Sequence, residues 1–108
     1  MNKDLHILTV CQKGNCRSVG TRYRLNRRKF RNVIAIGATN TSQETLKMLC
    51  DWADVILLAE FHHGDFLPKG FESKFEKNFT IGPDIWNNPL HSDLQNKLKQ
   101  KLDQLSLR

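Results

Sequence analysis

The chain has 108 residues, of which 39% are hydrophobic and 26% charged, and its net charge is +6. This length and composition predict one globular domain over residues 1–108 and exclude a disordered chain. No apolar run approaches the roughly 20 residues of a membrane span, and the chain enters its first apolar segment at once, so we expect no membrane partner and no signal peptide. Three cysteines without a Cys-x2-Cys pair argue against a disulfide framework or zinc cluster and favour a cytoplasmic protein.

The positive charge is concentrated near the N-terminus. Residues 1–31 hold nine Lys or Arg and one acid, a net charge of +8, whereas residues 32–108 hold eight Lys or Arg and ten acids, a net charge of −2. A basic end attracts anionic substrates, and it can equally mark a nucleic-acid surface or a solvated helix face. The residues concerned are Arg22, Arg24, Arg27, Arg28, Lys29 and Arg31.

Strand and helix patterns alternate along the chain. The first half predicts a strand at 5–10, a loop at 11–17, a helix at 18–29 with a thin stripe of Val19, Tyr23 and Asn26, a strand at 32–36 and a helix at about 42–52. The second half predicts a buried strand at 55–59, a short helix and loops at 60–76, a weaker strand at 79–81 and a last helix carrying Leu94, Leu98, Leu102 and Leu105 on one face. Capping-box spacings occur at Thr41 with Glu44 and at Ser92 with Gln95.

This order predicts an α/β fold, a three-layer α/β/α domain with a central four-stranded parallel sheet. Ligands bind such sheets outside the carboxyl ends of their strands. Cys11 follows the first predicted strand, and Asp84 comes just after the fourth. We therefore expect Cys11 and Asp84 to meet at one edge of the sheet.

The segment Cys11-Gln12-Lys13-Gly14-Asn15-Cys16-Arg17-Ser18 has the composition of a phosphate cradle. A Gly-containing turn between a strand and a helix can aim its backbone N–H groups at an anion, and the helix N-terminus adds partial positive charge. Arg17 can bind two phosphate oxygens with its planar guanidinium. The same field favours the thiolate of Cys11, which is the nucleophilic form.

A thiolate that attacks a phosphate monoester needs an acid to protonate the leaving oxygen. Asp84 is the best candidate, and Trp86 can form the wall of the cleft beside it. Ser18 can donate a hydrogen bond to the Cys11 sulfur and help it to leave in the second step. Rival acids stand at the end of the third strand, namely Glu60, His62, His63 and Asp65.

With these residues the chain resembles the low-molecular-weight protein-tyrosine phosphatase superfamily, above all its short bacterial and phage-type predicted members. The similarity lies in the Cys-x5-Arg-Ser element of residues 11–18, in the Trp-Ala-Asp segment within residues 51–60 and in the acid loop of residues 82–86. It implies phosphotyrosine, in a protein or as a small aryl phosphate, as the substrate, inorganic phosphate as product and inhibitor, and no cofactor. It also implies Cys11 as nucleophile, Arg17 as transition-state clamp, Ser18 as thiolate partner, Asp84 as general acid, and substrate contacts from Gln12, Lys13, Gly14, Asn15, Cys16 and Trp86.

Simpler roles stay open for several of these side chains. Ser18 can be the helix N-cap, Asp84 a turn residue and Cys50 part of a helix core, while Cys16 is either filler or, by the resemblance, a disulfide partner that protects Cys11. The histidine spacing predicts no metal site. Two other functions also remain open: an arsenate reductase on the same scaffold, or a weakly catalytic module that binds phosphate or nucleic acid.

Overall fold

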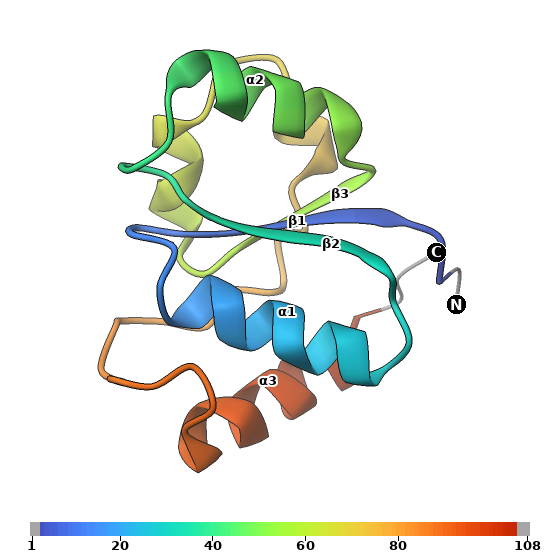
Figure 1. Ribbon diagram of the computed structural model, residues 1–108, viewed down its shortest axis with the longest axis vertical. Helices are drawn as coiled ribbons and strands as arrows, with labels where there is room; N and C mark the ends of the chain where they lie inside the picture. The colour runs from blue at the N-terminus through green and yellow to red at the C-terminus, as the bar shows by residue number, and fades with distance from the viewer. Residues whose placement is uncertain (1–2, 106–108) are drawn as a thin grey trace.

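The structure is a computed structural model that describes residues 3–105, and at its centre lies a parallel sheet (Figure 1). The strands β1 (His6–Cys11), β2 (Asn32–Gly37) and β3 (Val55–Leu58) are arranged in the order β2-β1-β3. The central strand pairs in parallel with both neighbours. The residues that follow the three strands therefore meet at one edge of the sheet, which is where Cys11 ends β1.

Helices cover both faces of the sheet. In Figure 1, α2 (Gln43–Trp52) lies above the strands, while α1 (Arg17–Arg27) and α3 (Ser92–Asp103) lie below. The alternation of side chains along β1 divides the core accordingly. Ile7 and Cys11 pack with Leu25 of α1 and the leucines of α3, whereas Leu8 packs with Leu46 of α2. The predicted α/β fold is confirmed at this level.

The segment between β3 and α3 contains two short 3-10 helices, η1 (Phe61–Phe66) and η2 (Glu72–Lys74). Residues 79–81, expected as a fourth strand, do not form one, and the sheet within residues 3–105 has three strands. A single bridge pairs Phe75 with Ile56, and the N–H groups of Ile81 and Gly82 both donate to the Ala59 carbonyl, at 2.7 and 3.1 Å. One shared acceptor does not make a strand ladder, but it fixes this segment beside the end of β3.

The first helix differs from its predicted form in its cap and in its buried face. Its N-cap is Cys16, so Ser18 is not the cap, and the residues that turn inward include Ser18, Thr21 and Leu25 rather than the predicted stripe. Small residues on this face let α3 approach closely. A Cβ on Gly20 would lie only 2.7 Å from the carbonyl oxygen of Pro89, just before α3, and 3.2 Å from the Leu94 side chain on α3.

Neither predicted capping box forms. Thr41 donates its hydroxyl to the Gly37 carbonyl, and the cap of α2 is Ser42, whose Oγ accepts from the backbone N–H of Thr45. The cap of α3 is His91, whose Nδ1 accepts from Asp93 N–H. The other members of the two boxes have different partners or lie exposed at the surface.

The predicted leucine face of the last helix is confirmed, because Leu94, Leu98, Leu102 and Leu105 are all buried. Cys50 is fully buried on the sheet side of α2, as expected of a core residue. Within residues 3–105, no helix combines the length and the apolar character that crossing a membrane requires.

Candidate active site at the Cys11 loop

The Cys11 sulfur lies at the carboxyl end of the central strand and faces two hydrogen-bonding groups. The side chain is 3% exposed. Gly14 donates its backbone N–H to Sγ at 3.2 Å, and the Ser18 hydroxyl lies 3.1 Å from Sγ. Both groups can donate a hydrogen bond to this sulfur. The predicted contact between Ser18 and the sulfur is thus present in the fold.

The loop of residues 12–16 rests directly on the end of β2, and glycine is required on both sides of that contact. Gly14 has φ +74°, and a Cβ there would lie 2.4 Å from the Gly37 nitrogen. In turn, a Cβ on Gly37 would lie 2.3 Å from the carbonyl carbon of Lys13. Two backbones approach each other more closely than any side chain allows, so the loop conformation depends on both glycines.

Hydrogen bonds from residues 39–40 hold the carbonyl groups of this loop. The Gln12 carbonyl accepts from both the N–H and the hydroxyl of Thr39, and the Lys13 carbonyl accepts from the Asn40 side-chain amide at 3.0 Å. By contrast, no acceptor within residues 3–105 takes the backbone N–H groups of Lys13, Asn15 or Cys16. Successive N–H groups of this kind, next to a helix N-terminus, can bind an oxyanion.

Arg17 is a buried cation with part of its hydrogen-bonding capacity unused. Its side chain is 2% exposed, and Nη1 makes both of its hydrogen bonds, to Glu60 Oε2 at 2.8 Å and to the Gly82 carbonyl at 2.7 Å. Nε is fully buried and has no partner among the described residues. A buried guanidinium N–H without an acceptor is costly, and a bound oxyanion would satisfy it.

Hydrogen bonds join the predicted acid loop to the Cys11 loop on both sides of Asp84. Gly82 accepts from Arg17, and the Trp86 carbonyl accepts from the Cys16 thiol at 3.2 Å. Burial, and then the charge of Asp84, raise the pKa of Cys16, so its thiol keeps the proton that it donates. Asp84 itself is exposed and lies in the chain between these two hydrogen-bonded residues.

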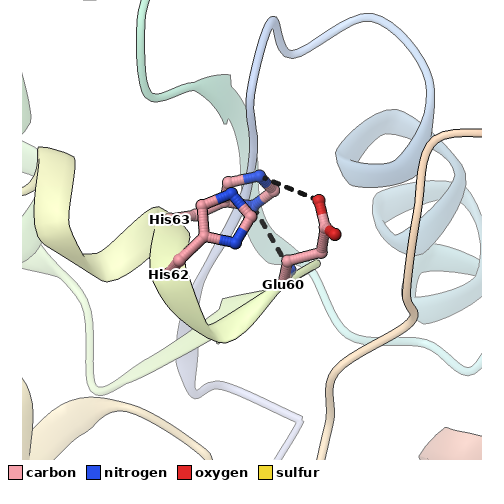
Figure 2. A group of neighbouring side chains, drawn as sticks. All are labelled: Glu60, His62 and His63. Carbon is pink, nitrogen blue, oxygen red and sulfur yellow. Dashed lines mark hydrogen bonds and ion pairs between the residues drawn. The ribbon is translucent and has the colours of Figure 1, made fainter.

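Glu60 and His63, considered only as rival acids in the sequence, interact with Arg17 and with each other. Hydrogen bonding to Arg17 holds the pKa of Glu60 below its ordinary value, so the carboxylate is the charge partner of the guanidinium. His63 is fully buried and its Nδ1 accepts the Glu60 backbone N–H at 3.2 Å (Figure 2). Burial, and then the charge of Arg17, lower the pKa of His63, which keeps the ring neutral. In the sequence, the feature that could have revealed this pair is a Glu and a His three residues apart at the end of a buried parallel strand.

Glu60, His62 and His63 together form a group of three potential metal ligands whose donor atoms lie within 4.8 Å of one another. The histidine spacing in the sequence does not reveal this group, and the hydrogen bonds of its members do not fit a metal. Since Nδ1 of His63 accepts a hydrogen bond, the neutral ring carries its proton on Nε2, the nitrogen that faces Glu60 at 3.4 Å. A metal-ligating histidine instead donates its second N–H. Moreover, Oε2 of Glu60 already binds Arg17.

The other rival acids, Asp65 and His62, are exposed on η1. Three of the basic residues near the N-terminus lie at the end of the sheet opposite Cys11. Lys3, Lys29 and Arg31 help to line a surface hollow of about 540 Å³ beside the starts of β1 and β2, at the opposite edge of the sheet. Of the remaining arginines in this group, Arg24 contacts Gln95 and Arg28 pairs with Asp103 on α3.

Comparison of the chain with protein-family models, with curated proteins and with solved structures gives no match. A cysteine with two hydrogen-bond donors, a buried arginine with a free N–H and a neighbouring carboxylate are the groups that phosphoryl transfer to sulfur requires.

Proposed function

We propose that this protein is a cysteine-dependent phosphatase that hydrolyses phosphotyrosine or a related aryl phosphate through a phosphocysteine intermediate. The proposal includes membership of the low-molecular-weight protein-tyrosine phosphatase superfamily, which the sequence resembles. It also includes a reducing cytoplasm, which keeps the three free cysteines as thiols. Its substrates are phosphorylated proteins or small aryl phosphates, and inorganic phosphate is both product and inhibitor.

One observation carries the proposal: the buried Arg17 has an unpartnered Nε. Nη1 is used by the protein, so the opposite edge of the guanidinium, with Nε and Nη2, remains for a ligand. That edge presents two parallel N–H bonds, which match two oxygens of a phosphoryl group. Arg17 stands six residues after a cysteine on a loop with free N–H groups, so the ligand it supports best is a phosphate ester.

The residues divide the reaction into two displacements. In the first, Cys11 Sγ attacks phosphorus, the P–S bond forms and the P–O bond to the aryl group breaks, while Asp84 gives its proton to the leaving oxygen. In the second, the Asp84 carboxylate takes a proton from water as that water attacks phosphorus. The P–S bond breaks, phosphate leaves, and Cys11 returns as a thiolate that the Ser18 hydroxyl and Gly14 N–H stabilise.

The test is hydrolysis of p-nitrophenyl phosphate, with inhibition by vanadate. We expect Cys11→Ser to abolish turnover, because a serine hydroxyl is a poor nucleophile without an adjacent base. Cys50→Ser is the matched control, since Cys50 is an equally buried cysteine on the opposite face of the sheet. Unchanged activity in Cys11→Ser would refute the mechanism.

The arsenate reductase alternative has less support from the geometry. It needs additional cysteines that carry oxidising equivalents away from the nucleophile. Cys50 packs on the α2 face, separated from the Cys11 face by the sheet, and the Cys16 thiol donates to the Trp86 carbonyl. Thiol consumption in the presence of arsenate would favour this alternative over phosphate transfer.

A second candidate function rests on the basic hollow near Lys3, Lys29 and Arg31. Three cations around one cavity favour an anionic ligand, and a nucleic-acid backbone supplies such a ligand. Binding of a DNA or RNA oligonucleotide that weakens steeply with salt and is lost in Lys29→Glu would support it. Binding that is indifferent to salt would contradict it.

A further inference from the structure

The geometry points to Glu60 and His63 as a positioning pair for Arg17. In this inference, which rests on the proposed phosphatase function, the two residues hold the guanidinium by Nη1 so that Nε and Nη2 meet the phosphoryl group. Neither residue touches the substrate. Both act through the orientation of Arg17.

The orientation of Arg17 follows from its two contacts. Both accept from the same nitrogen, since Nη1 lies 2.8 Å from Glu60 Oε2 and 2.7 Å from the Gly82 carbonyl. Nη1 carries two N–H bonds and the guanidinium is planar. Two acceptors on one nitrogen therefore fix the plane of the group, and with it the directions of the Nε and Nη2 donors.

His63 holds Glu60 at two points, as Figure 2 shows. Its Nδ1 accepts the Glu60 backbone N–H at 3.2 Å, and its Nε2 lies 3.4 Å from Glu60 Oε2, a contact too poor in geometry to be a hydrogen bond. Because Nδ1 is an acceptor, Nε2 carries the ring proton and presents a partial positive charge to the carboxylate. The ring is fully buried, so the carboxylate is held toward Arg17 by a side chain that cannot turn away.

Charge alone predicts the opposite effect of Glu60 on an oxyanion. A carboxylate beside a phosphate site repels the phosphate, so removing its charge should tighten oxyanion binding if Glu60 acts only through the field. If Glu60 positions Arg17, removing the charge should weaken oxyanion binding, because a neutral amide oxygen holds the guanidinium less strongly than a carboxylate does. The two accounts therefore predict opposite changes in oxyanion affinity for Glu60→Gln.

The experiment measures tungstate binding by calorimetry, together with kcat and KM for p-nitrophenyl phosphate. We expect Glu60→Gln to raise the tungstate Kd about tenfold, in the range of energies that couple contacting residues. In an Arg17→Ala background the same change should alter the Kd by less than about twofold, because the coupled residue is gone. Glu44→Gln, an exposed glutamate on α2, is the matched control.

His63 gives a second, independent measurement. His63→Asn keeps an acceptor near the position of Nδ1, whereas His63→Leu keeps none, so tungstate binding should be weakened less in the asparagine variant. Thermal unfolding of the two His63 variants shows whether each of them folds. If neither folds, tungstate binding by Glu60→Gln decides the question, because Glu60 is partly exposed and its substitution disturbs the core less.

The outcomes separate this inference from the proposed function. Equal or tighter tungstate binding by Glu60→Gln, in a protein that hydrolyses p-nitrophenyl phosphate and loses activity in Arg17→Ala, overturns the positioning pair alone. If the wild-type protein binds tungstate but hydrolyses no ester, the proposed phosphatase function is wrong. The tungstate Kd values of the variants still test whether Glu60 and His63 position Arg17. A wild-type protein that does not bind tungstate contradicts both.

Discussion

The Gly82 carbonyl accepts a hydrogen bond from Nη1 of Arg17 at 2.7 Å, and this bond joins the loop of the predicted acid to the loop of the predicted nucleophile. The hydrogen bond from the Cys16 thiol to the Trp86 carbonyl joins the same two loops, four residues further along the chain. Asp84 lies between these two points. Its position is therefore set by backbone contacts on either side, although its own side chain is exposed.

This arrangement predicts the effect of Asp84→Asn. The variant cannot give a proton to the leaving oxygen, so we expect hydrolysis of phenyl phosphate to slow by about 10² or more. The loss should be smaller for p-nitrophenyl phosphate, whose leaving group is stable without protonation. Asp65→Asn, on η1, is the control, and a larger effect of Asp65→Asn than of Asp84→Asn would transfer the acid role to Asp65.

The contact between Gly14 and Gly37 predicts a second result. Gly14→Ala places a Cβ 2.4 Å from the Gly37 nitrogen and adds a left-handed backbone conformation, which alone costs about 1–2 kcal/mol in a residue other than glycine. We expect a larger loss than this in the free energy of unfolding, measured in urea, together with loss of tungstate binding.

Gly70→Ala is the matched control for Gly14→Ala. Gly70 also has a positive φ, of +102°, but nothing lies within 4 Å of the position that its Cβ would take. The variant should therefore lose only the backbone contribution and bind tungstate as the wild type does. Equal losses in the two variants would show that the Gly14–Gly37 contact has no role of its own.

Ser18 carries a third prediction. Its hydroxyl lies 3.1 Å from Cys11 Sγ, and in the proposed mechanism it stabilises the thiolate as the phosphocysteine breaks down. Ser18→Ala should slow this second step by about tenfold, in keeping with the loss of one charge-assisted hydrogen bond, and a burst of p-nitrophenol should appear in rapid-mixing experiments. Thr21→Val, a buried change in the same helix whose hydroxyl bonds the Arg17 carbonyl, should show no burst.

Local pattern was sufficient to predict most of the fold. Short apolar runs located β1, β2 and β3, and the leucine spacing located the buried face of α3. The predicted helix caps were wrong because the capping residue is the one whose side chain has no other hydrogen-bond partner in the preceding turn. Thr41, for instance, is used by the Gly37 carbonyl, and the adjacent Ser42 caps α2 instead.

The candidate site was predictable where it is local and not where it joins distant segments. The Cys11–Ser18 contact follows from one strand–loop–helix unit, and the sequence shows it. The Arg17–Glu60 pair joins residues 43 apart, and a glutamate after a buried strand does not reveal whether it will act as an acid or as an anchor. Tertiary packing decides between those roles, because the buried guanidinium requires a charge partner.

The buried His63 predicts how stability changes with pH. Burial lowers its pKa below the ordinary value of 6.5, so the unfolded chain takes up a proton at a higher pH than the folded protein does. The free energy of unfolding should therefore fall as pH drops below 6.5, until the folded state is protonated as well. Glu60 adds to this loss at lower pH, because its pKa is depressed from 4.5 by Arg17 and its stabilising charge disappears as pH falls through the folded value.

His63→Asn should flatten the first part of this dependence, measured by urea unfolding at a series of pH values below 6.5, because the variant has no group there to protonate. His91→Asn is the control, since asparagine keeps the capping function that His91 has at the start of α3. The control should retain the wild-type slope. An unchanged slope in His63→Asn would mean that His63 takes up its proton over the same pH range in the folded protein as in the unfolded chain, which would contradict a neutral His63 ring below pH 6.5.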